Sequence, residues 1–355
     1  MSDVYEKLRA CLDNLLTGYP ATRSGIEIKI LKHLFSEQEA ELFVRLSPMP
    51  ERPFEIAKRI SRNPEDVARD LDKMAQKGLL YRVRKADSVA YSTPPFVPGI
   101  LEFQLNTIDQ ALALTIEDYY QEALGKGIQG NATPIMRTIP INTQMNATWP
   151  IVAPYDDAIE ILNKQKSIKV SHCICRLLGR LVQRGCNKPL ETCFHFGSMA
   201  DYYVENRMGR YVDAAEAKDI IRKNLEEAPL VIQVANAQKG GALCMCCGDC
   251  CEMLRSSKMQ SKPAESVRSN YYVKVNGATC KGCKTCVKRC QMDAIDVVDE
   301  KSIVNYDRCI GCGNCVVTCS SKSLELVKKP EDQRYVPPDN LMMTYMEIVT
   351  QRGKM

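Results

Sequence analysis

Two stretches with the same cysteine spacing, CKGCKTCVKRC (280–290) and CIGCGNCVVTC (309–319), decide the fold of the C-terminal part of this sequence. Each reads C-x-x-C-x-x-C-x-x-x-C, and the second begins 29 residues after the first, so the pair is an internal repeat. Three thiolates on one tight loop reach three corners of a cubic iron–sulfide cluster. The fourth corner must be approached from the far side, which requires a cysteine from elsewhere.

The spacing resembles that of bacterial two-cluster ferredoxins, in which the fourth cysteine of each run binds the cluster of the other run. Structural zinc is the alternative, but it usually takes two cysteine pairs separated by a longer knuckle. In the family a proline follows the fourth cysteine, whereas Gln291 and Ser320 stand here. The resemblance implies two [4Fe–4S] clusters, cluster one at Cys280, Cys283, Cys286 and Cys319, and cluster two at Cys309, Cys312, Cys315 and Cys290.

A second concentration of thiols lies upstream, in LCMCCGDCC (243–251). Its members Cys244, Cys247 and Cys250 repeat the C-x-x-C-x-x-C frame, and Cys246 and Cys251 are extra. Two cubes need eight thiolates, so one or two further iron–sulfur clusters are expected here; zinc and a non-cubane cluster with a bridging thiolate remain alternatives. With the upstream cysteines the set has nine members: Cys173, Cys175, Cys186, Cys193, Cys244, Cys246, Cys247, Cys250 and Cys251.

Two histidines, His172 and His195, flank these cysteines. Either is able to ligate iron or relay a proton, although a hydrogen bond to sulfur or backbone is the simpler interpretation. Arg176 follows a cysteine pair and is expected to balance cluster charge. Cys11 stands apart from all the other thiols and is expected to be a core residue of a helix.

The expected fold class is α+β and multidomain, with a winged-helix-like N-terminal domain, a small α/β cysteine-rich domain and a ferredoxin-like two-[4Fe–4S] domain. Helical periodicity over 26–46, a helix opened by Asn63-Pro64 and a two-stranded wing support the first of these. The predicted divisions are a winged-helix-like domain at 1–95, a helix and connecting segment at 96–149, the cysteine-rich domain with thiols on its loops at 150–251, a linker at 252–270, the ferredoxin domain at 271–329 and an extended tail with a short helix at 330–355.

Charge and composition indicate which classes of partner and which cellular location to expect. Residues 1–95 hold 16 Lys/Arg and 14 Asp/Glu, a net of +2, and the candidate recognition helix begins with Glu65 and Asp66, so protein docking is favoured over DNA. Residues 271–329 hold 10 Lys/Arg and 6 Asp/Glu, a net of +4, which offsets cluster charge or steers an acidic partner. No apolar run reaches the length of a membrane span and no signal peptide is recognised, so a cytoplasmic location is expected.

The chain as a whole resembles larger iron–sulfur proteins of anaerobic microbes that join a winged-helix-like region, a cysteine-rich segment and a C-terminal ferredoxin. The matching pieces are CICR (173–176), KPLETCFHFG (188–197), CMCCGDCC (244–251) and the two ferredoxin runs. The resemblance implies low-potential electron transfer as a subunit of a hetero-oligomeric oxidoreductase, with a flavin- or metal-containing enzyme as partner.

Three functions compete on these grounds. An electron-transfer subunit ranks first, because neither paired carboxylates nor a nucleophile–base signature is present and catalytic residues are unknown. A reductase whose middle thiols act on a disulfide or thioester is the alternative. A redox-sensing transcription regulator ranks last, because about four clusters exceed what a sensor needs.

Overall fold

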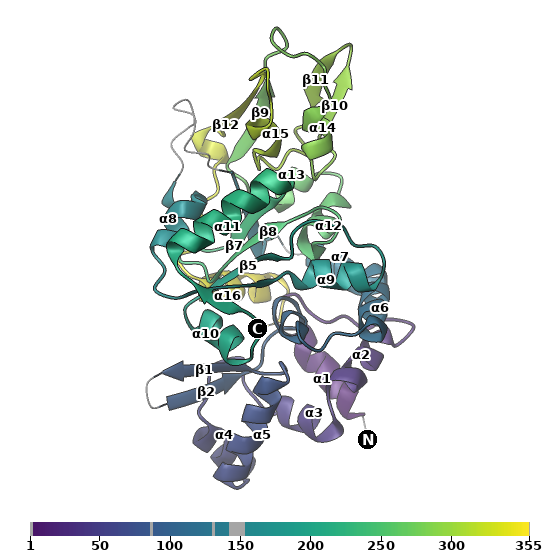
Figure 1. The fold of residues 1–355 in the computed structure, drawn as a ribbon. Helices are drawn as coiled ribbons and strands as arrows, with labels where there is room; N and C mark the ends of the chain where they lie inside the picture. The colour runs from purple at the N-terminus through teal and green to yellow at the C-terminus, as the bar shows by residue number, and fades with distance from the viewer. Residues whose placement is uncertain (1–2, 86–87, 130–131, 142–152, 355) are drawn as a thin grey trace.

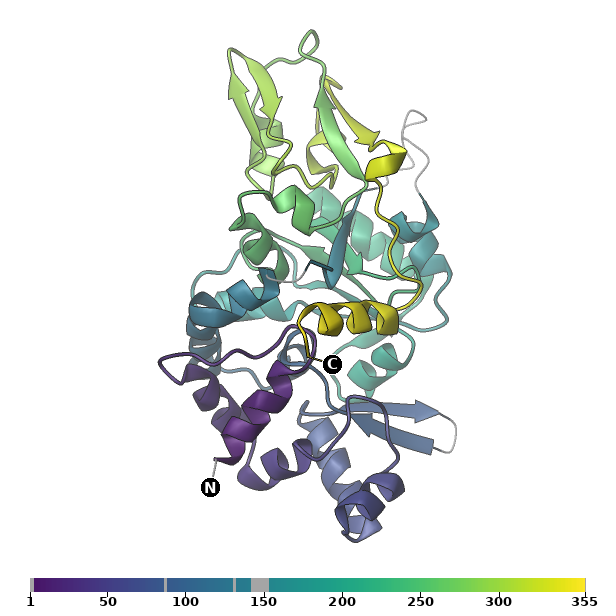
Figure 2. The ribbon, with the colours of Figure 1, turned by 180° about the vertical axis from the view of Figure 1, so that it is seen from behind.

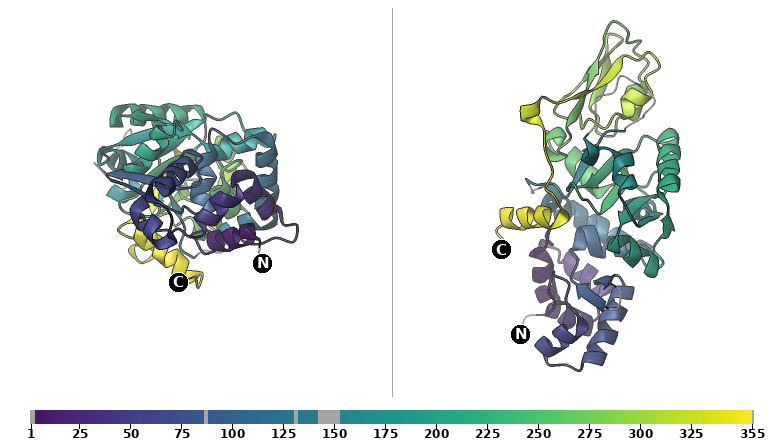
Figure 3. Two further views of the ribbon diagram at one scale, coloured as in Figure 1. Left: turned by 90° about the horizontal axis from the view of Figure 1, so that it is seen from below. Right: turned by 90° about the vertical axis from the view of Figure 1, so that its left-hand side faces the viewer.

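The computed structural model describes residues 3–85, 88–129, 132–141 and 153–354. Three regions follow one another along the long axis of the molecule (Figures 1 and 3): N-terminal helices with a hairpin, a central sheet with helices, and two small two-stranded sheets. Helices and strands are mixed throughout, as the α+β class requires. Across the described part of the chain, helices of the length and apolarity needed to cross a bilayer are absent.

The N-terminal region packs five helices and one antiparallel hairpin around a common core. The helix expected over 26–46 is divided in two, because the Ser36 hydroxyl caps a new helix and the Ser36 amide donates a return hydrogen bond to the Glu39 carboxylate. The winged-helix assignment itself stays a prediction. The elements are α1 (Val4–Asp13), α2 (Ile26–Leu34), α3 (Glu37–Phe43), α4 (Pro53–Ile60), α5 (Pro64–Gln76), β1 (Tyr81–Lys85) and β2 (Ser88–Ser92).

The following segment connects this core to the centre of the molecule. Apolar residues of α6 share one core with the N-terminal helices and with Leu178 and Tyr202 of the central region. The first two regions are therefore packed together by a continuous apolar contact. The elements are η1 (Phe96–Ile100), η2 (Glu102–Gln104), α6 (Gln110–Tyr119), η3 (Tyr120–Leu124) and α7 (Gly125–Gln129).

A six-stranded antiparallel sheet, in the order β3-β7-β8-β5-β4-β6, forms the central region. The sequence predicted that the cysteine-rich domain begins at residue 150, a position outside the described residues. Strand β3 lies before that position and belongs to the sheet, so the predicted start of the domain is wrong for the sheet. The strands are β3 (Met136–Ile139), β4 (Ile168–His172), β5 (Glu191–Phe196), β6 (Arg210–Val212), β7 (Val231–Ala235) and β8 (Ala242–Cys246).

Helices lie on both sides of this sheet. One face packs against α8 and α11 through residues such as Leu162 and Ile221, while α10 and α12 contribute to the cores on the other side. The helical elements here are η4 (Pro154–Asp156), α8 (Ala158–Asn163), α9 (Ile174–Leu181), α10 (Ser198–Glu205) and α11 (Ala214–Glu227).

Residues 252–270 are not the linker that their composition predicted. They form α12 (Glu252–Lys258) and α13 (Pro263–Ser266). Leu254 is fully buried, and Ser256 shares a hydrogen bond of 2.8 Å with the Tyr120 hydroxyl. Leu254 of α12 and Val267 after α13 thus anchor a polar-looking segment in the core.

The C-terminal region contains two antiparallel strand pairs with a short helix after each cysteine loop. The chain then runs back along the molecule, and α16 (Leu341–Gln351) lies beside the central and N-terminal regions (Figure 2). There Arg352 pairs with Asp13 at 3.3 Å. The other elements are β9 (Tyr271–Val275), α14 (Thr285–Arg289), β10 (Ile295–Val298), β11 (Lys301–Val304), α15 (Asn314–Val317), β12 (Leu324–Lys328) and η5 (Glu331–Gln333).

A buried ion pair ties β3 to the C-terminal region. Arg137 and Asp156 are paired and almost completely buried, and Asn270 donates to the second Asp156 oxygen at 3.0 Å. We expect Asp156→Asn to lower the free energy of unfolding by about 3 kcal/mol, because it leaves the Arg137 charge buried and unpaired. Urea unfolding followed by circular dichroism measures this.

The matched control is Asp219→Asn, which breaks an exposed ion pair to Arg222 on α11. Such pairs contribute little, so a change below about 0.5 kcal/mol is expected. Equal losses in the two variants would contradict the role given to the buried pair.

Candidate metal centres

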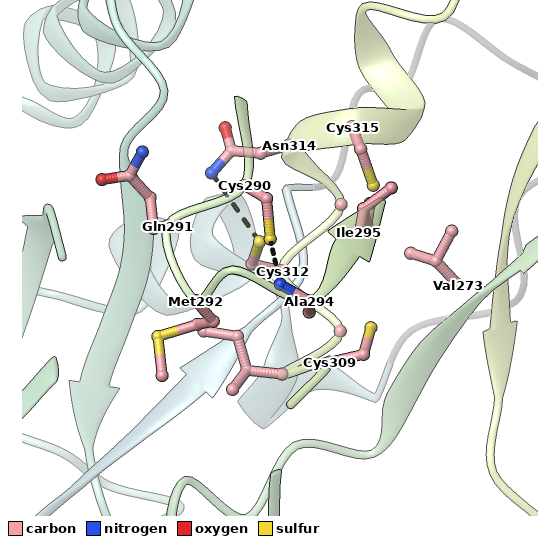
Figure 4. Close-up of a pocket in the computed structure, with 13 residues that line it drawn as sticks. Val273, Cys290, Gln291, Met292, Ala294, Ile295, Cys309, Cys312, Asn314 and Cys315 are labelled. Carbon is pink, nitrogen blue, oxygen red and sulfur yellow. Dashed lines mark hydrogen bonds between the residues drawn. The ribbon is translucent and has the colours of Figure 1, made fainter. Parts of the chain in front are cut away.

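Cysteines from both ferredoxin runs line one pocket at the base of the C-terminal region (Figure 4). Cys290 comes from the first run, and Cys309, Cys312 and Cys315 come from the second. The Ala294 amide donates to the Cys290 sulfur at 3.2 Å, and the Asn314 side chain donates to the Cys312 sulfur at 3.7 Å. Val273, Met292, Ile295 and Ile310 supply apolar walls. Four thiols in an apolar pocket with N–H donors aimed at sulfur suit an anionic cluster.

Among the remaining four ferredoxin cysteines, Cys280 and Cys319 are half-buried and Cys286 is buried. Ser302 joins two of them, since its amide donates to the Cys280 sulfur at 3.4 Å and its hydroxyl lies 3.3 Å from the Cys286 sulfur. Cys283 is exposed. Hydrogen bonds from Ser302 lower the pKa of Cys280, and hydrogen bonds from Thr285 lower that of Cys283. These donors favour thiolates, the form that binds iron.

Cys319, the last cysteine of the second run, lies next to this outer set. Its sulfur accepts from the Ser323 amide at 3.3 Å, and the Ser323 hydroxyl accepts from Thr279, the neighbour of Cys280, at 3.2 Å. The two fourth cysteines are thus held alike, each by the amide four residues further on. The repeat in sequence is a repeat in local geometry.

The residue that replaces the usual proline after Cys290 makes a contact between regions. The Gln291 side-chain oxygen accepts a hydrogen bond of 3.0 Å from the Gly248 amide, in the middle of CMCCGDCC. A methyl group on Gly248 would lie 2.3 Å from the Gln291 carbonyl oxygen, so only glycine fits there. The ferredoxin pocket and the middle cysteines are therefore in direct backbone contact.

The nine middle cysteines divide into two groups because side chains alternate along a strand. Cys244 and Cys246 lie on β8 and point to one face, whereas Leu243 and Met245 point to the other, where Cys247 continues their series. Cys193 on β5 pairs in register with Cys244, and their sulfurs are 3.8 Å apart. The frame of Cys244, Cys247 and Cys250 suggested by the sequence is consequently split between two faces of the sheet.

The first group, which we call the six-thiol array, consists of neighbouring thiols that contact one another in series: Cys173, Cys175, Cys251, Cys246, Cys244 and Cys193. Three of its members lie on strands, contrary to the expectation that loops carry the middle cysteines. Cys173 is the N-cap of α9, and its contact with Cys175 together with burial raises the pKa of its thiol.

The second group, which we call the Cys186 triad, consists of Cys186, Cys247 and Cys250. The Cys186 sulfur lies 3.8 Å from that of Cys247 and 3.7 Å from that of Cys250. All three sulfurs lie within 4.8 Å of one another. Cys186 reaches this position from the loop after α9, while the other two come from the turn after β8.

Two fully buried cations face these thiols. The Lys169 ammonium lies 2.6 Å from the Ser171 hydroxyl and 3.6 Å from the centre of the Tyr203 ring. Burial lowers the Lys169 pKa to about 8, and Cys193 and Cys244 oppose that shift. Arg176 donates to the Thr192 hydroxyl at 2.9 Å and to two backbone carbonyls, and its Nε has no partner.

Neither cation pairs with a carboxylate in the part of the chain that the structure describes. Burial disfavours the Arg176 charge, but Cys173 and Cys247 outweigh it and raise the pKa of the guanidinium. A buried cation without a counter-charge is costly. The thiols are the available anions, so this site is built for thiolates, as metal binding requires.

Protonatable groups also gather near Cys193. The His195 ring stacks on Tyr203 at 4.5 Å, and its Nδ1 lies 3.9 Å from the Cys193 sulfur. Burial raises the pKa of Glu102 to about 8. His172, in contrast, is exposed. Lys169, Tyr203 and Glu102 were not predicted from the sequence. Lys169 could have been found, because it occupies an inward position of the strand-like IKVSH (168–172).

Comparison with known proteins assigns the C-terminal region. Residues 272–320 match the protein family described as a 4Fe-4S dicluster domain. Neither the curated proteins nor the solved structures include a match to the chain. The protein is therefore an iron–sulfur protein, and its dicluster domain has an electron-transfer role. The donors at Cys290, Cys312 and Cys280 fit that cofactor.

The contact between Gly248 and Gln291 gives a test of the link between regions. We expect Gly248→Ala to separate them, because the added methyl group would meet backbone atoms at 2.3 Å. Faster limited proteolysis and a lower thermal midpoint are the expected results. Gly277→Ala is the control, since its methyl group would enter open space; identical behaviour of the two variants would show that the contact is dispensable.

Lys169 gives a test of the array's charge. If the array holds the iron–sulfur cluster expected from its cysteines, the loss of a buried cation beside that cluster disfavours the reduced state, which is more negative. Lys169→Met should then lower the reduction potential of the cluster by tens of millivolts. EPR-monitored redox titration measures it. Lys166→Met, at an exposed position before β4, is the control. An unchanged potential in Lys169→Met would mean that no redox centre lies beside Lys169.

Proposed function

We propose that this protein carries electrons through a chain of iron–sulfur clusters between two redox partners. Cluster one is assigned to Cys280, Cys283, Cys286 and Cys319, and cluster two to Cys290, Cys309, Cys312 and Cys315. The six-thiol array is assigned one further iron–sulfur cluster. The carrying observation is that cysteines of the array and of the pocket belong to one buried cluster, which includes Cys246 and Cys251 together with Cys309 and Cys315.

The order of the clusters follows from burial. Cluster one is the outer end, because Cys283 is exposed whereas Cys309 and Cys315 are buried. Cluster two lies between cluster one and the array, since Gln291 joins its ligand loop to Gly248. Electrons would pass one at a time along this series, and the array would exchange them with the second partner.

The outer end suggests the nature of one partner. Lys281, Lys284 and Lys288 are exposed around the first cysteine run, and an acidic surface would complement them. We assign this partner to the flavin- or metal-containing oxidoreductases and place the protein in a cytoplasmic hetero-oligomer. The N-terminal region, whose winged-helix-like character remains a proposal, would serve as a protein-docking domain.

Removal of one cluster-two ligand tests the proposed order. We expect Cys290→Ser to lower the iron content by about four per chain and to slow the reduction of the array by viologen radical added as donor. Stopped-flow absorbance and freeze-quench EPR follow the two steps. Cys11→Ser is the control, since Cys11 lies on α1 in the N-terminal core and belongs to neither ferredoxin run. Undiminished array reduction in Cys290→Ser would contradict a path through cluster two.

A second function, reduction of a disulfide or thioester at the array, is favoured by one observation. His195, Tyr203 and Lys169 surround Cys193 and could supply protons to a reduced product. A change in the array's EPR signal on adding a disulfide or thioester to the isolated, reduced protein would support this function. An EPR signal that changes with neither the disulfide nor the thioester would contradict this second function and favour electron transfer alone.

A further inference from the structure

The Cys186 triad has the dimensions of a site for a single metal ion. A tetrahedral zinc with Zn–S bonds of about 2.3 Å holds its sulfurs about 3.8 Å apart. The Cys186 sulfur lies 3.8 Å from the Cys247 sulfur and 3.7 Å from the Cys250 sulfur. Two of the three sulfur–sulfur separations thus match the edge length of a zinc tetrahedron.

The close grouping distinguishes the triad from the other cysteines. Among the described residues, it is the one set of three Cys, His, Asp or Glu side chains whose ligand atoms all lie within 4.8 Å. A cube takes its thiolates at separate irons, which spreads the sulfurs. The ferredoxin cysteines show that wider arrangement, and the array extends as a series of pairs instead of a compact triangle.

The loop that carries Cys186 is fastened to the turn that carries Cys247 and Cys250. Lys188 forms an ion pair with Asp249, and Arg184 donates to the Asp249 carbonyl. Arg180 on α9 donates to the Cys186 carbonyl at 3.3 Å. Close packing completes the arrangement, because a methyl group on Gly179 would lie 3.3 Å from the Cys250 sulfur. These contacts hold the three sulfurs together before a metal arrives.

The surrounding charge suits three thiolates. Zn²⁺ with three thiolates carries a net charge of −1, and Arg176, which contacts Cys247 from a fully buried position, balances it. Lys188 is a second cation beside Cys186 and Cys247. The triad lies on the opposite side of β8 from the six-thiol array. The Arg176 charge interacts with Cys173 of the array and with Cys247 of the triad, so it compensates negative charge in both groups.

We propose that Cys186, Cys247 and Cys250 bind one Zn²⁺ and leave its fourth position to an exogenous ligand, water in the resting protein. No fourth Cys, His, Asp or Glu within the described residues joins the group. Three protein ligands with an open position characterise zinc sites that bind a reactant, whereas purely structural sites are closed by four. The zinc is redox-inert and lies outside the electron path, so the site is independent of the proposed cluster order.

Metal analysis of the full chain, purified anaerobically, tests this proposal. We expect about one zinc per chain in the wild type and its loss in Cys186→Ser, with iron and acid-labile sulfide unchanged. Cys11→Ser should keep the zinc. Absence of zinc in wild-type protein supplied with zinc, or loss of iron and sulfide from Cys186→Ser, would overturn the proposal.

X-ray absorption at the zinc edge needs no variant and reports the coordination directly. Three sulfurs at about 2.3 Å and one oxygen or nitrogen are expected. Four sulfurs would overturn the open position, and two or fewer would overturn the triad as the binding site. Failure of the proposed electron transfer would appear in iron and EPR signals and leave this readout untouched.

Discussion

The alternation of side chains along β8 is the constraint on which the centre of the molecule depends. Because neighbouring residues of a strand face opposite ways, Cys244 and Cys246 are separated from Cys247. A run of five cysteines in eight positions therefore supplies two different sites. One site shares a buried cluster with α12 and the ferredoxin pocket, and the other shares the core beneath α8 and α11.

Electrostatics adds a second constraint on the same region. Lys169 and Arg176 are fully buried and face thiols instead of carboxylates. With neutral thiols these two charges would lack compensation, which costs several kcal/mol for each ion. Metal binding would convert the thiols to thiolates and remove that cost, so the proposed metal centres would couple metal binding to folding of the central region.

The parts of the molecule that were predictable from sequence are those with local signals. The spacing of the two ferredoxin runs predicted a dicluster domain, and the family match confirms it. The strands β5 and β8 were not predicted, because the cysteines in ETCFHF and ALCMC were interpreted as metal ligands on loops. Without β8 as a strand, the frame of Cys244, Cys247 and Cys250 looked like a third cluster loop.

Other differences between the predicted and the observed structure come from tertiary packing, for which the sequence contains no local signal. Residues 252–270 looked like a linker, but burial of Leu254 and the contact of Ser256 with Tyr120 fix them as α12 and α13. The strand β3 joins the sheet from before the expected boundary by pairing with β7. Lys169 was overlooked because a lysine usually lies on the surface, and only the position of its strand shows that it is buried.

Quantitation of iron and acid-labile sulfide per chain, on protein prepared without oxygen, tests the central claim most directly. Two ferredoxin cubes and one cluster in the six-thiol array predict about twelve irons and a matching amount of sulfide. About eight irons would leave the array without a cluster and contradict the proposed chain of electron carriers.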